Sequence, residues 1–222
     1  MPQVVVSYDG TRNDRDALAL GRLFALAGAN VTLAYVRHAA DPDPQGEAAA
    51  QAEAENLLSV GAAQLEGSPV EKRVIFHSST AEGLATLVAE LGAEVIAFGS
   101  SYRTPTGHVD VPHTAEQLLE RGIACSMAIA PAGLRREPVE QSIGTVTFVG
   151  EDADPAAQET ATSLARALGA TVTTEEADLL VIASRAAAPP GQLLLSGVAL
   201  ERLEEARCPV LLLARGTALS FG

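Results

Sequence analysis

The sequence predicts an α/β protein with a doubly wound, mostly parallel five-stranded sheet, followed by a shortened four-stranded repeat. Short β-branched runs alternate with helix-like segments, which is typical of right-handed βαβ crossovers. This pattern stops at a polar stretch and then starts again. Two pairs of segments also match between the halves: LFALAGANVT with LARALGATVT, and AEVIAFGSS with ADLLVIASR. These observations together predict an internal repeat of one α/β unit.

The first half, residues 1–131, contains five predicted strands, each a short run of apolar residues. They are expected at residues 3–7, 31–36, 70–76, 94–98 and 125–130. Glu71, Lys72 and Arg73 mark the third strand as an exposed edge. The helices between the strands have apolar residues at helical spacing, and two of them stop at glycine. They are expected at residues 12–28, 46–65, 80–91 and 113–121.

Residues 132–143 are polar and are predicted to be a linker, after which residues 144–222 repeat the pattern. Strands are expected at residues 144–149, 171–174, 178–183 and 208–213, and helices at residues 155–168 and 194–206. The matching segments lie far apart in the first half, at 23–32 and 93–101, but close together in the second, at 164–173 and 177–185. A piece is therefore missing from the second half, and we expect it to be the second helix, the third strand and the third helix.

Composition excludes several classes of function. The chain has 28 acidic and 15 basic residues, a net charge of −13, which argues against nucleic acid as a partner. No apolar run reaches the ~20 residues of a membrane helix, and residues 1–20 lack a signal-peptide pattern, so we expect no membrane partner. The cysteines Cys125 and Cys208 are too few for a disulfide or metal framework, which favours a cytoplasmic location.

Three segments resemble the universal stress protein family. They are VVVSYDGTRNDRDALALGRLFALAGANVTLAYV, AEVIAFGSS, and ADLLVIASRAAAPPGQLLLSGVALERLEEARCPVLLLARG. The resemblance covers nearly the whole chain and looks like a tandem protein with a truncated second copy. It implies an adenine nucleotide alpha hydrolase-like fold. It also implies a homodimer, or an intrachain pseudo-dimer, through the last strands at residues 125–130 and 208–213.

One branch of this family binds ATP through a loop with the signature G-x2-G-x9-G-[ST]. Glycines there let backbone amides close on the phosphates. The four positions in this chain are Gly99, Tyr102, Pro112 and His113, so only the first matches. Pro112 has no N–H to donate. The equivalents in the second half are Ala183, Ala186, Ser196 and Gly197, with Gly150 at the position of Asp9. The resemblance therefore implies a degenerate nucleotide loop in both halves.

The first half nevertheless retains candidate cofactor-binding residues for ATP or AMP. By resemblance, Ser7, Asp9, Val36 and Gly99 line the nucleotide pocket. Arg103 and His113 could supply side-chain contacts to phosphate, with Thr114 beside them at the start of the helix. Alternatively, Asp9-Gly10 is only a turn that precedes a helix.

No catalytic motif and no metal-ligand spacing stands out. The chain has no G-x-S-x-G, no P-loop and no H-E-x2-H. The histidines His38, His77, His108 and His113 all follow strands at the carboxyl edge. They could bind an anion or a metal or sense pH, or they could be independent loop residues.

The sequence thus predicts a non-enzymatic cytoplasmic stress-response protein that acts by binding or scaffolding. One alternative is an ATP- or AMP-binding sensor that uses a variant loop in the first half. Another is a weak ATP hydrolase.

Overall fold

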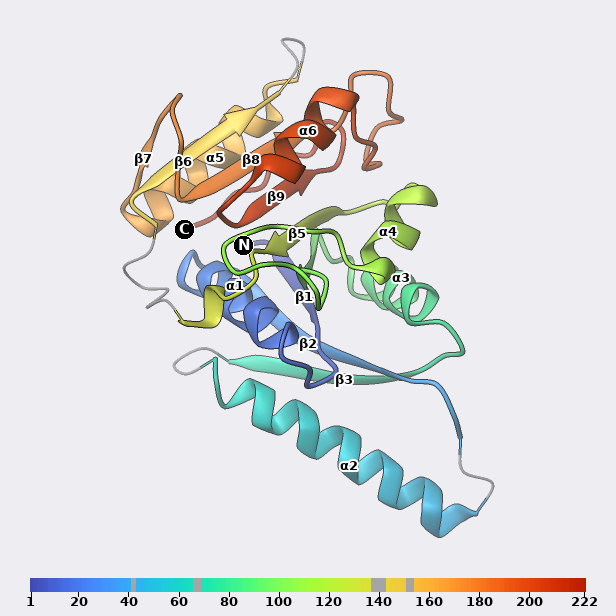
Figure 1. The fold of residues 1–222 in the computed structure, drawn as a ribbon. Helices are drawn as coiled ribbons and strands as arrows, with labels where there is room; N and C mark the ends of the chain where they lie inside the picture. Colours follow the sequence, from blue (N-terminus) through green and yellow to red (C-terminus); the bar gives the residue numbers. More distant parts are fainter. Residues whose placement is uncertain (41–42, 66–68, 137–142, 151–153) are drawn as a thin grey trace.

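The computed structural model describes residues 1–40, 43–65, 69–136, 143–150 and 154–222. The strands of these residues form one nine-stranded sheet (Figure 1). They are β1 (Gln3–Ser7), β2 (Asn30–Arg37), β3 (Val70–Phe76), β4 (Val95–Gly99), β5 (Ser126–Ala130), β6 (Thr145–Val149), β7 (Thr171–Val172), β8 (Leu179–Ala183) and β9 (Val210–Leu213). The prediction of five strands followed by four is confirmed.

The strand order β3-β2-β1-β4-β5-β9-β8-β6-β7 joins the two halves edge to edge. Neighbouring strands are parallel except β5 and β9, which run antiparallel with Ala128 opposite Leu211. The last strands of the two halves therefore pair within one chain, as the intrachain alternative predicts. Each covers the polar backbone edge that the other would expose.

Helices cover both faces of the sheet (Figure 1). One face packs against α1 (Asp14–Leu26), α2 (Pro44–Ala62) and α5 (Ala156–Leu168), and the other against α3 (Thr80–Leu91), α4 (His113–Glu120) and α6 (Gly197–Glu205). Side chains alternate between the faces: Val4 and Val6 lie on the α1 side and Val5 on the α3 side, all buried. No helix of the described residues is long and apolar enough to span a bilayer.

The second half omits the expected piece. Residues 173–178 lead from β7 directly to β8, whereas α2, β3 and α3 lie between β2 and β4. Val146 pairs with Leu179 as Val4 pairs with Val95, so Thr147 takes the place of Val5. Thr147 is half-buried because no counterpart of α3 covers it. A hydroxyl is better suited than an isopropyl group to this wetter position.

Three boundaries in the second half differ from expectation by two residues or more. The last helix begins at Gly197 rather than residue 194, because the Ser196 side chain caps it by accepting the Ala199 N–H. β7 is limited to Thr171–Val172, and β9 starts after Pro209, which has no N–H for a sheet ladder. Of the expected linker, Leu134–Arg136 forms a 3-10 turn, and residues 137–142 lie outside the described residues.

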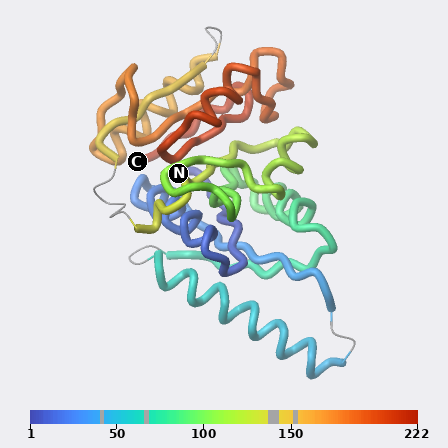
Figure 2. Tube along the Cα trace, viewed as in Figure 1, coloured from blue at the N-terminus to red at the C-terminus, as the bar shows by residue number. Residues whose placement is uncertain are grey.

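The C-terminal segment returns to the first half, as the trace in Figure 2 shows. The Phe221 ring stacks on Phe24 of α1 with centroids 5.8 Å apart, and the Phe221 N–H donates to Ser163 of α5. The Gly222 N–H donates to Ala27. This segment therefore joins α1 to α5 across the junction between the halves.

Candidate functional site

The carboxyl ends of three neighbouring strands collect four of the predicted site residues. Ser7 ends β1, Gly99 ends β4 and Val36 lies one residue before the end of β2. Asp9 follows β1 by two residues and is exposed, whereas Val36 is buried. Because β1 lies between β2 and β4, these residues share one edge of the sheet. Ligands of open α/β sheets bind at such an edge.

Asp9 belongs to a pair of carboxyl groups that sequence reasoning missed. Its backbone N–H donates to the carboxylate of Asp14, and its side chain accepts the Thr11 N–H at 2.9 Å. Burial, with the hydrogen bond and charge of Asp9, raises the pKa of Asp14 to about 8. Burial opposes ionisation of Asp9, but the hydrogen bonds from Asp14 and Thr11 outweigh it and lower its pKa. The two carboxyl groups therefore titrate as a coupled pair, in which Asp14 is the member that is harder to ionise.

The turn between β1 and α1 lies directly on Gly99. A Cβ atom built on this glycine would overlap the backbone carbonyl of Asn13. The Asn13 side chain also donates to the Ser100 carbonyl at 2.7 Å. The lack of a side chain at Gly99 therefore makes room for the Asn13 backbone.

The loop after β4 uses its backbone donors internally. Six N–H groups of this loop donate to acceptors of the chain, namely those of Ser100, Ser101, Thr104, Gly107, His108 and Asp110. The Ser100 side chain is central: it donates to Ala130 at 2.7 Å and accepts the Asp110 N–H at 3.1 Å. These donors are already satisfied, whereas a phosphate cradle presents free donors to the ligand.

The remaining predicted site residues, Arg103, His113 and Thr114, form no hydrogen bond or ion pair with Asp9 among the described residues. Arg103 lies over the ring of Tyr102, 5.0 Å from its centroid, and the Tyr102 side chain is 77% exposed rather than set against a ligand space. His113 and Thr114 begin α4 after Pro112. The His113 side chain is exposed and contacts Glu116 and Gln117 of its own helix.

The loop after β8 repeats this arrangement. Ser184 accepts the Leu194 N–H at 2.9 Å, as Ser100 accepts the Asp110 N–H, but it donates to the Leu194 carbonyl at 2.8 Å, whereas Ser100 donates to Ala130. The Gly191 N–H donates to Arg215, as the Gly107 N–H donates to Ala132. This pattern agrees with the match of AEVIAFGSS to ADLLVIASR, which makes Ala183 the counterpart of Gly99.

One predicted correspondence is wrong. Val4 and Val146 occupy equivalent positions in the strand pairing of the two halves. Gly150 is therefore the counterpart of Tyr8 and not of Asp9. The position of Asp9 then falls on residue 151, which lies outside the described residues. The repeat alignment missed this because the connection from β6 to β7 is one residue shorter than the connection from β1 to β2.

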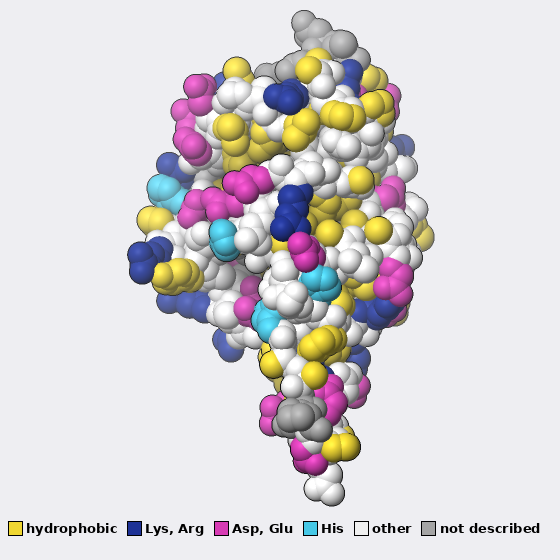
Figure 3. Space-filling model, turned by 90° about the vertical axis from the view of Figure 1, so that its right-hand side faces the viewer, with side chains coloured by type: hydrophobic (Ala, Val, Ile, Leu, Met, Phe, Trp, Pro, Cys, Tyr) yellow, Lys and Arg dark blue, Asp and Glu magenta, His cyan; other side chains and the backbone are white. Residues whose placement is uncertain are grey.

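The four histidines do not form a single cluster. His38 contacts the His77 carbonyl at 3.0 Å and the Thr80 hydroxyl at 3.1 Å, while His77 lies 3.8 Å from Glu82. His108 and His113 make other contacts. The part of the chain that the structure describes contains no group of three or more side chains suited to a metal ion. On the face drawn in Figure 3, histidine, acidic and basic side chains are interspersed.

Comparisons with known proteins agree with this architecture. The model of the universal stress protein family matches residues 1–131. A universal stress protein from Archaeoglobus fulgidus DSM 4304 is 14% identical with a TM-score of 0.69, over 96% of this chain and 98% of that one. A protein of unknown function from Pseudomonas aeruginosa PAO1 is 14% identical with a TM-score of 0.64, over 97% and 93%. No curated protein matches the chain by sequence.

Proposed function

This chain belongs to the universal stress protein family, and we propose that it is a non-enzymatic member that acts by binding or scaffolding other proteins. In this proposal residues 1–131 and 144–222 are two repeats, and the nucleotide site is degenerate in both. Ser7, Asp9, Val36 and Gly99 are then remnants of a pocket, and Arg103, His113 and Thr114 do not complete it.

The observation that carries the proposal is the internal use of the loop amides. Six N–H groups after β4 already have acceptors, and Asn13 lies on Gly99. A phosphate that used these six donors would have to break hydrogen bonds that are worth about 1 kcal/mol each. The second loop repeats the main bonds around Ser184 and Gly191.

We also propose that the chain is a monomer in the cytoplasm. β5 and β9 already pair with each other, so a second copy has no free last strand to join. Both cysteines are free, which suits a reducing compartment. Light scattering should give 22.9 kDa, whereas twice that mass would favour the homodimer alternative.

One observation favours a second function, an ATP or AMP sensor. Ser7, Val36 and Gly99 share the edge where ligands of such sheets bind, and Asp9 is exposed beside them. A sensor would require the Asn13 turn to move away from Gly99.

Nucleotide content and affinity distinguish the two functions. The purified protein would be denatured and its extract analysed for adenine nucleotides by absorbance and mass. ATP would then be titrated into the empty protein and into Asp9→Ala by calorimetry. We expect no co-purified nucleotide and no saturation at about 1 mM ATP. Micromolar binding that Asp9→Ala abolishes would overturn the proposal in favour of the sensor.

A further inference from the structure

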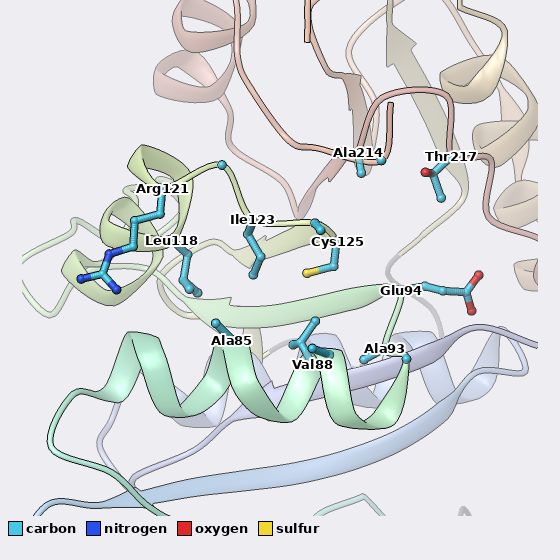
Figure 4. Close-up of a pocket in the computed structure, with 15 residues that line it drawn as sticks. Ala85, Val88, Ala93, Glu94, Leu118, Arg121, Ile123, Cys125, Ala214 and Thr217 are labelled. Carbon is cyan, nitrogen blue, oxygen red and sulfur yellow. The ribbon is translucent and has the colours of Figure 1, made fainter. Parts of the chain in front are cut away.

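A cavity of about 510 Å³ lies at the amino ends of β4 and β5, away from Gly99 (Figure 4). Its wall is apolar and comes from α3, α4 and the segments before the two strands. The side chains are Ala85, Val88, Ala93, Leu118, Ile123 and Cys125. Ala214 and Thr217, from the C-terminal segment, close the cavity from the second half. Both halves of the chain therefore build it.

The second half contains a related groove of about 690 Å³ at the amino ends of β8 and β9. In the alignment that pairs the two loops, Leu118 corresponds to Arg202, and the strand pairing makes Cys208 the counterpart of Cys125. The groove extends over Thr147 and Leu180 because no counterpart of α3 covers them. The second groove therefore has a more polar lining than the first cavity, with Arg202, Glu205 and Arg207 among its residues.

The first cavity has the size and polarity of a small-molecule site. Such sites occupy roughly 300–1,000 Å³ and are lined mostly by apolar side chains. The Cys125 sulfur faces the cavity in Figure 4. Burial raises the pKa of this thiol to about 12, so it stays neutral and contributes to the apolar wall.

Two charged residues lie on opposite sides of the apolar wall (Figure 4). On one side, the Arg121 guanidinium lies 2.8 Å from Glu82 and is more than half exposed. On the other side, the Glu94 carboxylate accepts the Gln3 N–H at 3.2 Å. Glu94 would repel an anionic end group, whereas Arg121, which uses one nitrogen for Glu82, has further N–H donors with which to bind one.

We propose that this cavity binds a medium-length aliphatic carboxylate, with the chain against the apolar wall and the carboxylate toward Arg121. The proposal goes beyond the protein-binding function and does not depend on the nucleotide loops.

Decanoate titrated into the full chain by calorimetry is the first test. We expect saturable binding to one site that weakens about fourfold for each methylene removed in shorter acids. Arg121→Gln should weaken decanoate several-fold and leave uncharged decanol unchanged. Absence of saturation up to about 1 mM decanoate would overturn the proposal. An equal effect of Arg121→Gln on both ligands would overturn the assignment of the carboxylate.

A tryptophan substituted into the cavity wall tests where the aliphatic chain binds, because the protein has no tryptophan of its own. Ala85 on α3 lines the cavity, whereas its neighbour Thr86 is exposed and does not. Ala85→Trp should show blue-shifted emission and lose decanoate binding by at least about tenfold. Thr86→Trp, the matched control, should emit as an exposed indole and bind like the wild type. Decanoate binding that survives in folded Ala85→Trp would overturn the location. Should Ala85→Trp fail to fold, the chain-length series on the wild type still tests the site.

Discussion

The loops after β4 and β8 share one set of backbone hydrogen bonds although their side chains differ. Ser100 and Ser184 each accept the N–H of the residue ten positions later, and Gly107 and Gly191 donate to equivalent positions after the last strands. The second loop keeps this arrangement although its half lacks two helices and a strand. The loop conformation therefore depends on local serine and turn contacts and on the adjacent last strand.

The two halves differ in what lies next to each loop. In the first half the Asn13 carbonyl lies on Gly99, which leaves no space for a Cβ atom. In the second half the loop begins with Ala183, whose Cβ lies 3.6 Å from the Cβ that Gly150 would carry. A single matching glycine therefore does not identify a nucleotide site, because the same glycine can be needed for internal packing.

The largest expected effect concerns two aspartates that hold the segments after the last strands. Asp16 accepts two backbone N–H groups at 2.9 Å and lies 2.7 Å from Arg135, while Asp154 binds Arg215 at 3.2 Å and the Gly216 N–H at 3.0 Å. Asp16→Ala should lower the free energy of unfolding by about 3 kcal/mol, because it leaves an arginine and two donors unpaired. Asp154→Ala should cost about 2 kcal/mol. Urea denaturation measures the free energy of unfolding of both variants. A larger loss for Asp154→Ala than for Asp16→Ala would contradict the predicted ranking.

A smaller effect is expected where each loop begins. Gly99→Ala should lower the free energy of unfolding by about 2 kcal/mol, because the new methyl group must displace the Asn13 backbone. Ala183→Gly in the second half should cost only about 1 kcal/mol, mainly through added backbone freedom. Thermal and urea denaturation of the two variants give the ranking. An unchanged free energy of unfolding for Gly99→Ala would mean that the turn around Asn13 can move away from residue 99.

The two serines should be nearly equivalent. Ser100→Ala leaves the Asp110 N–H without its acceptor, and Ser184→Ala does the same to the Leu194 N–H. Each variant should lose about 1 kcal/mol of unfolding free energy. Parallel urea curves would support one shared framework. A strong effect in only one half would show that the two loops are held differently.

A dependence of stability on pH is expected from the Asp9–Asp14 pair of the first half. The pKa of Asp14 is raised to about 8 in the folded protein, above its usual value of 3.8. Between these values the folded chain holds more protons than the unfolded chain, so this group makes the wild type less stable as pH rises. Asp14→Asn should therefore gain stability relative to the wild type between pH 5 and about 8. Urea denaturation at pH 5 and at about pH 8 measures the stability difference between Asp14→Asn and the wild type. A difference that does not change with pH would contradict the raised pKa of Asp14.

Apolar periodicity predicted the strands and helices because these depend on local patterns, and the spacing of the segments that match between the halves predicted the missing piece. It could not predict that Asn13 lies on Gly99, since that contact joins residues far apart in the chain. Asp14 was missed for a related reason, because its pKa depends on burial and on its position beside Asp9. The packing of Phe221 on Phe24 likewise depends on how the two halves are joined.

Six N–H donors of the loop after β4 are already used by the protein itself. The most direct test follows the backbone amide signals of Ser101, Gly107 and Asp110 by nuclear magnetic resonance during titration with ATP and magnesium. The account predicts no saturable shift up to about 5 mM ATP, together with slow hydrogen exchange at these amides. Saturable shifts at these three positions would contradict it and would identify the loop as a working nucleotide site.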